Sequence, residues 1–289
     1  MLLIQPIIRP PSEANSLLLQ ITVGCSSNTC TFCGAYANKP FGVMEESDIE
    51  YDIKEAADLY PDVRKIFLLD GDALALNNKR LVPILKLINK SFLKLSRIAS
   101  YANGYNITKR TSDELRELRN HNLNLIYMGL ESGSQKVLDA CKKRSSVEEM
   151  IEAVRMADDA NIKSSVIVLL GLGGVQCSDV HVRDTIEALN KMQPRYLSFL
   201  SLMLIKDTPL YKQAETGKFK ELNSTELVRE AYDIIKGLEL NKTIFRSNHA
   251  SNYLSLEGRF PKDKEKLLNM LKLAIDGNVK LRDEIFRGL

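Results

Sequence analysis

Three cysteines within one short segment are the residues of this sequence best suited to chemistry. The segment reads Cys25-Ser-Ser-Asn-Thr-Cys30-Thr-Phe-Cys33 and follows an apolar run, Leu17–Val23. Three closely spaced thiolates can bind three irons of a 4Fe–4S cluster. The fourth iron would then lack a protein ligand and could bind a small molecule. The spacing therefore indicates a cluster with an open coordination site, which distinguishes a reactive cluster from one that only carries electrons.

Other uses of these thiols stay open at this point. A structural zinc site normally has four protein ligands, and no His or further Cys lies near the three in sequence to complete one. A disulfide would use two of the thiols and leave the third unpaired. Zinc binding and unligated thiols are therefore the alternatives to the cluster.

The composition narrows the class of protein. The chain has 289 residues, 44% of them hydrophobic, which is enough for one large domain or a domain with a tail. A net charge of +3 without a basic stripe argues against nucleic-acid binding. The apolar segment from Met1 to Arg9 is too short for a membrane span and lacks a cleavage site. Five cysteines, an odd number, suit a reducing cytoplasm, so we expect a cytoplasmic protein.

Short apolar runs alternate with helical patterns over the first two thirds of the chain. The predicted strands are Leu17–Val23, Lys65–Leu69, Arg97–Tyr101, Leu125–Gly129, Ser165–Leu170 and Tyr196–Leu204. Their Ile, Val, Leu and Phe content is typical of parallel strands buried on both faces. Six β-α units are fewer than the eight of a closed barrel, so we expect an α/β fold with an open partial (β/α)6 barrel. A doubly wound flat sheet is the alternative, since periodicity does not separate the two.

Capping patterns and composition place the helices and the segment boundaries. Ser47-x-x-Glu50, Thr111-x-x-Glu114 and Ser146-x-x-Glu149 each fit a capping box, and a further helix is predicted over Asp179–Met192. After Leu204 the pattern becomes helical, over Thr225–Leu238 and Lys262–Asn278. We therefore expect an N-terminal extension (1–16), a barrel core (17–204) and a C-terminal helical region (205–289) that closes the barrel.

Polar or glycine-rich turns follow the predicted strands, where parallel α/β folds build their sites. These turns are Leu69-Asp70-Gly71-Asp72, Tyr101-Ala-Asn103-Gly-Tyr105, Gly129-Leu-Glu131-Ser132-Gly133-Ser134 and Gly171-Leu-Gly173-Gly174. We expect them to form one site with the cysteine loop. Asp70 and Asp72 could instead cap the next helix. No Gly-x-Gly-x-x-Gly follows the first strand, which argues against a dinucleotide-binding fold.

The cysteine loop resembles that of the radical S-adenosylmethionine (SAM) superfamily. That family usually spaces its thiols Cys-x3-Cys-x2-Cys with an aromatic residue before the last one. Phe32 takes that place here, whereas four residues rather than three separate Cys25 from Cys30. Gly129–Leu138 is similar to the fourth-strand motif of the branch that contains oxygen-independent coproporphyrinogen oxidases and methylthiotransferases, and Asn161–Gly174 is similar to its fifth-strand segment.

Two further turns resemble the family, each with a substitution. Leu69-Asp-Gly-Asp72 stands where the family keeps a Gly-Gly-Glu-like turn, with Asp in place of the first Gly and of the Glu. Asp207-Thr-Pro-Leu-Tyr211 is similar to a Gly-Thr-Pro-Leu-Tyr turn, with Asp207 in place of Gly. Together the similar segments cover residues 17–211 in the family's order.

The resemblance implies a 4Fe–4S cluster on Cys25, Cys30 and Cys33 with SAM at the open iron. It implies reductive cleavage of SAM to a 5′-deoxyadenosyl radical, which abstracts hydrogen from a substrate. The implied SAM contacts are Phe32, Ile167 and Gly171 at adenine, Gly71 and Asp72 at the methionine ammonium, Glu131 at the ribose with Ser132 beside it, and Arg144 at the carboxylate.

Candidates for substrate contact or catalysis are more scattered. They are Tyr101 and Asn103 after the third strand, His181 after the fifth-strand loop, and His249 and Asn252 in the C-terminal region. The segment Ser247-Asn-His-Ala-Ser-Asn-Tyr253 is dense in hydrogen-bonding side chains. We therefore expect His249, Asn252 and Tyr253 to form part of the substrate side of the cavity.

Three functions are consistent with these patterns. The first is a radical SAM enzyme that acts on a small molecule and takes electrons from a donor such as flavodoxin or ferredoxin. The second is a radical SAM enzyme that modifies RNA or a peptide. The third is a non-catalytic protein that carries electrons or a cluster. The absence of a second cysteine group argues against a two-cluster methylthiotransferase, and no membrane partner is expected.

Overall fold

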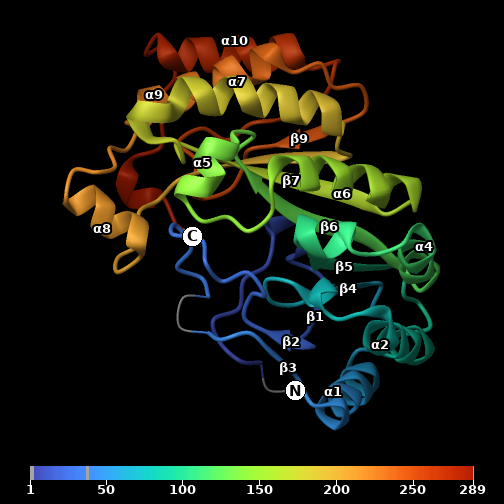
Figure 1. Ribbon diagram of the computed structural model, residues 1–289. Coiled ribbons are helices and arrows are strands. Elements are labelled where there is room, and N and C mark those ends of the chain that lie inside the picture. Colours follow the sequence, from blue (N-terminus) through green and yellow to red (C-terminus); the bar gives the residue numbers. More distant parts are fainter. Residues whose placement is uncertain (1–2, 37–38, 289) are drawn as a thin grey trace. The chain divides into compact units, whose positions relative to one another are not determined.

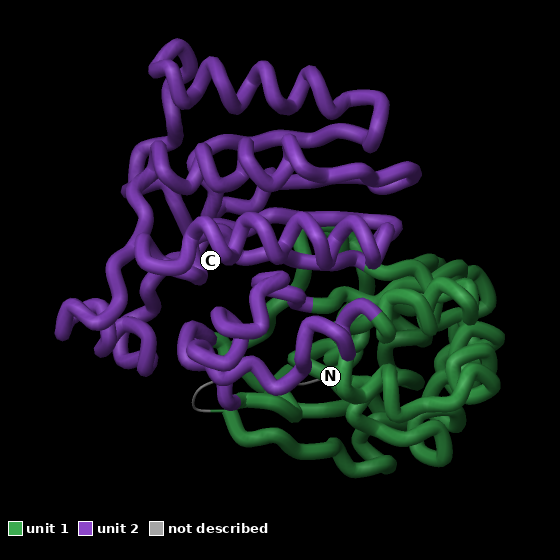
Figure 2. The backbone as a smooth tube through the Cα atoms, turned by 45° about the horizontal axis from the view of Figure 1, so that its top comes forward, with its two compact units in different colours: residues 1–28, 35–128, 152–164 green, residues 29–34, 129–151, 165–289 purple. Residues whose placement is uncertain are grey.

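The computed structural model describes residues 3–36 and 39–288, which divide into two compact units. Unit 1 contains residues 1–28, 35–128 and 152–164, and unit 2 contains residues 29–34, 129–151 and 165–289 (Figure 2). Residues 1, 2, 37, 38 and 289, which fall within the predicted segments, lie outside the described residues. The segment boundaries expected at residues 16 and 204 stay a prediction.

A parallel sheet forms the centre of unit 1 (Figure 1). Its strands are, in order, β1 (Leu17–Leu19), β4 (Lys65–Leu68), β5 (Arg97–Tyr101) and the first part of β6 (Leu123–Glu131). The helices are α1 (Glu46–Leu59), α2 (Asn78–Ser91), α3 (Gly104–Thr108) and α4 (Ser112–Asn120), with short 3-10 turns at η1 (Pro11–Glu13) and η2 (Ala73–Ala75). A separate antiparallel pair joins β2 (Thr22–Val23) to β3 (Gly42–Val43).

Unit 2 contains a mixed sheet and the C-terminal helices. β7 (Lys163–Leu170), β8 (Tyr196–Ser201) and β9 (Ile244–Arg246) run parallel, and β10 (Glu257–Arg259) pairs antiparallel with β9. The helices are α5 (Gln135–Ala140), α7 (Gly174–Met192), α8 (Pro209–Glu215), α9 (Ser224–Gly237) and α10 (Lys264–Ile275), followed by η3 (Glu284–Phe286). The remaining helix, α6 (Val147–Asp159), has residues in both units.

Apolar strand residues form the core of each unit. Ile66, Phe67 and Leu68 of β4 are completely buried, and so are Val166 and Val168 of β7. Burial of each such side chain is worth roughly 1.5–3 kcal/mol relative to exposure. This burial on both faces is what the near-continuous apolar runs predict for parallel strands.

Five of the six predicted strands are present, as β4 to β8. The strand predicted over Leu17–Val23 is split: β1 covers Leu17–Leu19 in the parallel sheet, whereas Thr22 and Val23 form β2, which pairs with β3 instead. The capping boxes at Thr111 and Ser146 are confirmed, because each hydroxyl accepts from the amide three residues on and each glutamate bonds back. The capping box predicted at Ser47 is wrong, since Ser47 lies inside α1, which begins at Glu46 with Glu45 as its N-cap. The predicted Asp179–Met192 helix is confirmed and begins earlier, at Gly174.

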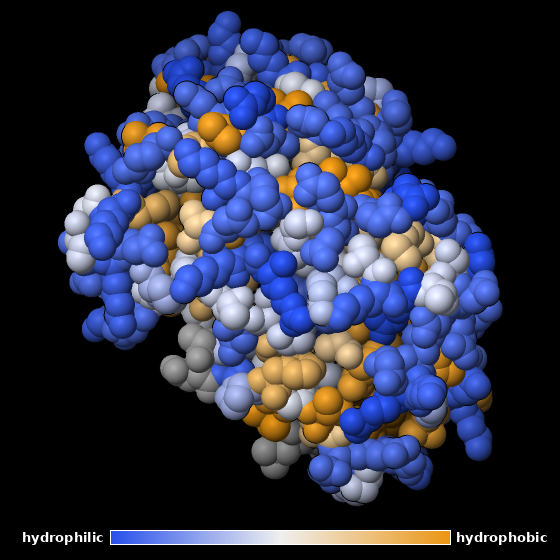
Figure 3. All heavy atoms as spheres, in the orientation of Figure 1, coloured by the Kyte–Doolittle hydropathy of each residue, from blue (hydrophilic) through white to orange (hydrophobic). Residues whose placement is uncertain are grey.

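The C-terminal region is helical as predicted, with two additional strands. Helix α10 packs on α9, and α9 packs on α7 (Figure 1). Each helix therefore covers apolar side chains of the next. The buried positions of α10 are Leu267, Leu271 and Ala274, at helical spacing. Hydrophilic side chains dominate the face of this region that is turned to the viewer in Figure 3. β9 and β10 have three residues each, too few for an alternation pattern to predict.

Candidate functional site

In unit 1, Cys25 lies directly against the turn that follows β4. The amide of Gly71 donates to the carbonyl of Gly24 at 3.0 Å, which draws this turn onto the cysteine loop. A Cβ placed on Gly71 would come within 2.6 Å of the Cβ and 3.0 Å of the Sγ of Cys25. Only glycine permits so close an approach of backbone to side chain.

Asp70 fixes the same turn through its backbone conformation and its buried carboxylate. Its backbone has φ +67°, the left-handed region that glycine adopts most readily and that Asp tolerates. Its carboxylate accepts from Lys39 Nζ at 2.9 Å, from Gln20 Nε2 at 2.7 Å and from the amide of Gly24 at 3.2 Å. Asp70 is therefore a buried structural anion, and the alternative in which it caps the next helix is wrong.

Asp72 is the buried carboxylate of the turn. Its Oδ2 accepts from Ser26 Oγ at 2.6 Å, from Asn103 Nδ2 at 2.9 Å and from Asn106 Nδ2. It makes no side-chain bond to η2, so the capping alternative is wrong for this residue too. Burial raises the pKa of its carboxyl, against the hydrogen bonds from Ser26, Asn103 and Asn106 that lower it. Its other oxygen, Oδ1, is buried without a hydrogen-bond partner, which is costly unless a ligand supplies a donor.

In unit 2, the other two cysteines lie in a loop tied to neighbouring elements. The amide of Thr31 donates to the carbonyl of Cys141 at 2.9 Å, and the carbonyl of Thr31 accepts from Leu210 at 2.9 Å. Phe32 packs against a buried cluster formed by Val137, Cys141, Leu169, Leu172, Leu202 and Leu210. The ring of Phe32, which is predicted to contact adenine, thus packs on apolar side chains near the ends of β7 and β8.

The five cysteines, all within the described residues, form no disulfide. Cys25, Cys30 and Cys33 are partly exposed, whereas Cys141 is buried. Burial raises the pKa of the Cys141 thiol to about 12, so it stays protonated and serves as a packing residue. The three loop thiols are the accessible ones of the predicted site, and Cys177 is a partly buried thiol at the beginning of α7.

At the end of β6, Glu131 has φ +63° and faces a lysine. Its Oε1 lies 3.3 Å from Lys143 Nζ, and the side chains are only 14% and 10% exposed. Lys143 was not predicted as a site residue. Ile167, on β7, is half-buried and pairs with Ser198 of β8, and Arg144 is exposed in the turn before α6.

Two of the candidate catalytic residues are buried in the interior of unit 2. His181 is completely buried on α7, with Nδ1 at 2.8 Å from Ser132 Oγ. Asn252 is 3% exposed and binds Ser201 Oγ, the Phe199 carbonyl and Ser247 Oγ. Asn252 therefore fixes the C-terminal segment to the end of β8, and its amide is fully used there.

The remaining candidates are more accessible. His249 is half-buried and contacts Ser251 through Nδ1 at 2.9 Å. Tyr101 is partly exposed at the end of β5, where its ring lies edge-on to those of Phe67 and Tyr127. Asn103 joins Asp72, as described above.

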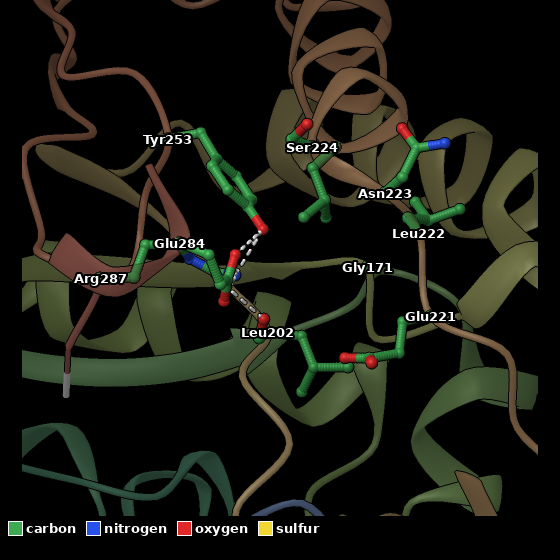
Figure 4. Close-up of a pocket in the computed structure, with 10 residues that line it drawn as sticks. Gly171, Leu202, Glu221, Leu222, Asn223, Ser224, Tyr253, Glu284 and Arg287 are labelled. Carbon is green, nitrogen blue, oxygen red and sulfur yellow. Dashed lines mark hydrogen bonds and ion pairs between the residues drawn. The ribbon is translucent and has the colours of Figure 1, made fainter. Parts of the chain in front are cut away.

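A cavity of about 290 Å³ lies within unit 2, beyond the ends of β7 and β8 (Figure 4). Gly171 and Leu202 supply the strand-end part of its lining, with Leu227 of α9. Tyr253, Glu284 and Arg287 lie on one side of it and Glu221 to Ser224 on the other (Figure 4). The Arg287 guanidinium lies 4.2 Å from the centre of the Tyr253 ring and bonds to the Leu202 carbonyl at 2.9 Å. Partial burial raises the pKa of Glu221, against the charge of Arg287.

The residues present fit an iron–sulfur cluster with SAM. The donor set is three accessible thiols, the type that holds such clusters. The orphaned Oδ1 of Asp72, next to Gly71, fits the methionine ammonium expected there. No three His, Cys, Asp or Glu side chains among residues 3–36 and 39–288 are already gathered to hold a metal ion. Three observations therefore support the fit: the ligands are thiols, these thiols are accessible, and Gly71 lies against Cys25.

The family model of the radical SAM superfamily matches residues 19–189, more than half of the chain. The chain belongs to this family, as the sequence resemblance predicts, and the family's cofactors are a 4Fe–4S cluster and SAM. The α/β fold class, with the order of strands and helices of the family's partial (β/α)6 TIM-like barrel, is confirmed.

Individual similarities are weaker. A protein of Methanocaldococcus jannaschii that carries a provisional methylthiotransferase name is 24% identical over 242 residues, 76% of this chain and 52% of that protein. The heme chaperone HemW of Bacillus subtilis is 20% identical over 176 residues, 61% of this chain and 46% of that protein. Coproporphyrinogen III oxidase (HemN) of Escherichia coli shares the fold with a TM-score of 0.57 and 18% identity, over 76% of this chain and 50% of HemN.

The chain spans about half the length of these relatives. No helix in the described part of the chain is long and apolar enough to cross a membrane.

Sequence reasoning missed several residues of the site. Ser26 and Asn106 complete the partners of Asp72, and Glu230 of α9 binds the end of β7. Glu230 had a signal: it follows Leu227 by three residues and precedes Ile234 by four, so it interrupts the apolar face of an amphipathic helix. Asn106 had none, because an Asn in a short polar turn is usually a solvent-exposed turn residue.

Proposed function

We propose that this chain is a radical SAM enzyme acting on a small polar molecule. Cys25, Cys30 and Cys33 hold the 4Fe–4S cluster, and SAM occupies the fourth iron. When bound, the reduced cluster and SAM supply a 5′-deoxyadenosyl radical that abstracts hydrogen from the substrate. Electrons come from a donor such as flavodoxin or ferredoxin, and the enzyme works in the cytoplasm.

The observation that carries this proposal is the arrangement at Asp72. A buried carboxylate with one unpartnered oxygen stands beside Gly71, and Gly71 touches Cys25. This arrangement supports the proposal, because a carboxylate oxygen that could accept from an ammonium group belongs to the residue next to Gly71, which contacts Cys25. In this proposal, Asn103, Asn106 and Ser26 orient Asp72, so that Oδ1 is left for SAM. Glu131, held by Lys143, binds the ribose.

The cavity beyond β7 and β8 is the proposed substrate pocket. Gly171 and Leu202 connect it to the strand ends where the adenosine part of SAM is expected, and Tyr253 and Arg287 come from the C-terminal region. Its lining is mostly polar, and it includes the charges of Glu221, Glu284 and Arg287, which suits a small molecule with polar groups. In this proposal residues 205–289 also exclude water from the radical.

The test is anaerobic reconstitution, followed by incubation with dithionite, SAM and fractions of a cell extract. We expect 5′-deoxyadenosine to form, and to form faster with a small-molecule fraction. The control is the variant in which all three loop cysteines are Ala. Faster cleavage only with RNA or peptide fractions would favour macromolecule modification. A reconstituted protein that binds a cluster but cleaves no SAM would favour a non-catalytic carrier, the function that the similarity to the heme chaperone HemW suggests.

A further inference from the structure

A buried line of polar contacts in unit 2 joins the ends of two strands through two helices. Glu230 of α9 accepts from the Gly171 amide at 2.6 Å through Oε1 and from Ser178 Oγ through Oε2. His181 of α7 lies with Nε2 at 3.5 Å from the same Oε1 and with Nδ1 at 2.8 Å from Ser132 Oγ. Ser132 Oγ also accepts from the amide of Ser134 at 3.0 Å. His181 Nε2 has no hydrogen-bond partner, so its 3.5 Å approach to Glu230 is a contact and not a hydrogen bond. One hydrogen-bonded group therefore holds the end of β6 and another holds the end of β7, and the two meet at this contact.

The spatial order Ser132, His181, Glu230 is that of a serine nucleophile with a histidine base and a carboxylate. Burial excludes the role of nucleophile for Ser132. Ser132 and His181 are both 0% exposed, so no substrate can reach the hydroxyl. Burial lowers the pKa of His181 to about 4, against the charge of Asp184, so the ring is neutral at ordinary pH. A neutral ring in the interior is suited to orientation rather than proton transfer to a ligand.

Glu230 is suited to accept from Gly171 whether or not it is charged. Burial raises the pKa of its carboxyl to about 7, against the hydrogen bonds from Ser178 and Gly171 and with the nearby charge of Asp233. In the protonated form Oε2 can carry the proton and donate it to Ser178 Oγ, while Oε1 still accepts from Gly171. A glutamine can reproduce this second arrangement, with its oxygen on Gly171 and its amide on Ser178.

The helix that carries Glu230 also packs on Gly171. Gly171 has φ +81°, and a Cβ there would lie 2.7 Å from Leu227 Cδ2. Both Leu227 and Glu230 lie beyond residue 189, where the match to the family ends. The end of β7 is therefore held by a part of the chain that the family model does not cover.

We propose that Glu230 and His181 are positioning residues that fix Gly171 and Ser132 for the adenosine part of SAM. This inference rests on the proposed function, in which Glu131, the residue before Ser132, binds the ribose and the adenosine part of SAM lies at the strand end next to Gly171. Glu230 acts through the Gly171 amide, and His181 acts through the Ser132 hydroxyl.

The test compares Glu230→Met, which keeps length but removes both acceptors, with Glu230→Gln, which keeps them. Arg229→Gln, an exposed change on the same helix, is the control. The dissociation constant of SAM is measured by anaerobic equilibrium dialysis on reconstituted protein. Hydrogen exchange of a peptide covering residues 165–173 is measured in the same variants without SAM.

We expect Glu230→Met to weaken SAM binding about tenfold, the effect of losing one hydrogen bond in a buried site. The exchange of the 165–173 peptide should rise in parallel. Glu230→Gln should restore both to within about threefold of wild type, as Arg229→Gln should. A Met variant that binds SAM as wild type does, or a Gln variant as weak as Met, would overturn the inference. A wild-type protein that binds no SAM would instead overturn the proposed function, and the exchange experiment would still test the Glu230–Gly171 bond.

Discussion

Gly71 lies so close to Cys25 that a methyl group would not fit between them: a Cβ would come within 2.6 Å of the cysteine Cβ. Gly71→Ala must therefore displace the thiol or the turn, which costs roughly 1–3 kcal/mol for overpacking of this kind. We expect the reconstituted variant to retain less iron than wild type. Gly42→Ala is the matched control, because a Cβ at Gly42 meets nothing within 4 Å. Equal iron content in the two variants would contradict a role for the Gly71–Cys25 approach.

The Asp70–Lys39 pair is predicted to be a large contributor to stability. The two charges are 2.9 Å apart, with side chains 1% and 6% exposed. Replacement of Asp70 therefore leaves the Lys39 charge buried without its counter-ion, bonded only to the carbonyls of Ile4 and Pro6. Asp70→Asn should lower the free energy of unfolding of the apo protein by about 3 kcal/mol or more. The exposed pair Lys94–Asp62 is the comparison, and Lys94→Ala should cost less than about 1 kcal/mol.

Urea denaturation measures both variants. An Asp70→Asn variant no less stable than Lys94→Ala would show that the buried pair is not the anchor of the Asp70 turn.

Glu131→Ala is predicted to weaken SAM binding more than it lowers stability. Glu131 lies at the carboxyl end of β6, where parallel folds build sites. Loss of its hydrogen bond should cost roughly 1 kcal/mol of SAM binding, or somewhat more for a charged acceptor. The dissociation constant of SAM and the melting temperature are both measured for the variant and for wild type. Unchanged affinity with a collapsed melting temperature would make Glu131 a structural partner of Lys143 only.

Glu230 and His181 should make the stability of unit 2 depend on pH in opposite directions. The folded pKa of Glu230, about 7, is above its ordinary 4.5, so its contribution is complete below pH about 4.5 and is lost as pH rises through 7. The folded pKa of His181, about 4, is below its ordinary 6.5, so its contribution is complete above about 6.5 and is lost as pH falls toward 4.

Glu230→Gln removes the first effect alone. Relative to wild type, the variant should gain stability as pH rises from about 5 to 8, by at most roughly 3 kcal/mol. Urea unfolding of both proteins across this range measures the difference. A difference that is constant with pH would mean that Glu230 does not titrate in this window.

The strand order and most of the strand-end residues were predictable from the sequence, because parallel strands need apolar runs and their sites lie at the following turns. Cys25, Gly71, Asp72 and Asn103 were predicted individually. The structure brings all four together, with Gly71 against Cys25 and Asn103 bonded to Asp72. What the sequence could not provide was the partner of each polar group. His181 is a candidate catalyst by residue type, yet its burial depends on the packing of α7 and α9, which no local pattern records.

The C-terminal region shows the same limit. Asn252 and Tyr253 are neighbours in a polar segment, and sequence alone treats them alike. The structure commits the Asn252 amide to Ser201 and Phe199, while Tyr253 lines the cavity with Arg287. Arg287 lies 34 residues further along the chain, so only tertiary structure could associate it with Tyr253.

The central claim is the cluster on Cys25, Cys30 and Cys33, and metal analysis after anaerobic reconstitution tests it most directly. Wild type should contain about four irons and four acid-labile sulfides per chain, with a brown chromophore that air destroys. Replacement of any one of these cysteines by Ala should remove most of this iron, whereas Cys141→Ala, at the buried thiol, should leave it in place. About one zinc per chain, with no brown chromophore, would contradict the account.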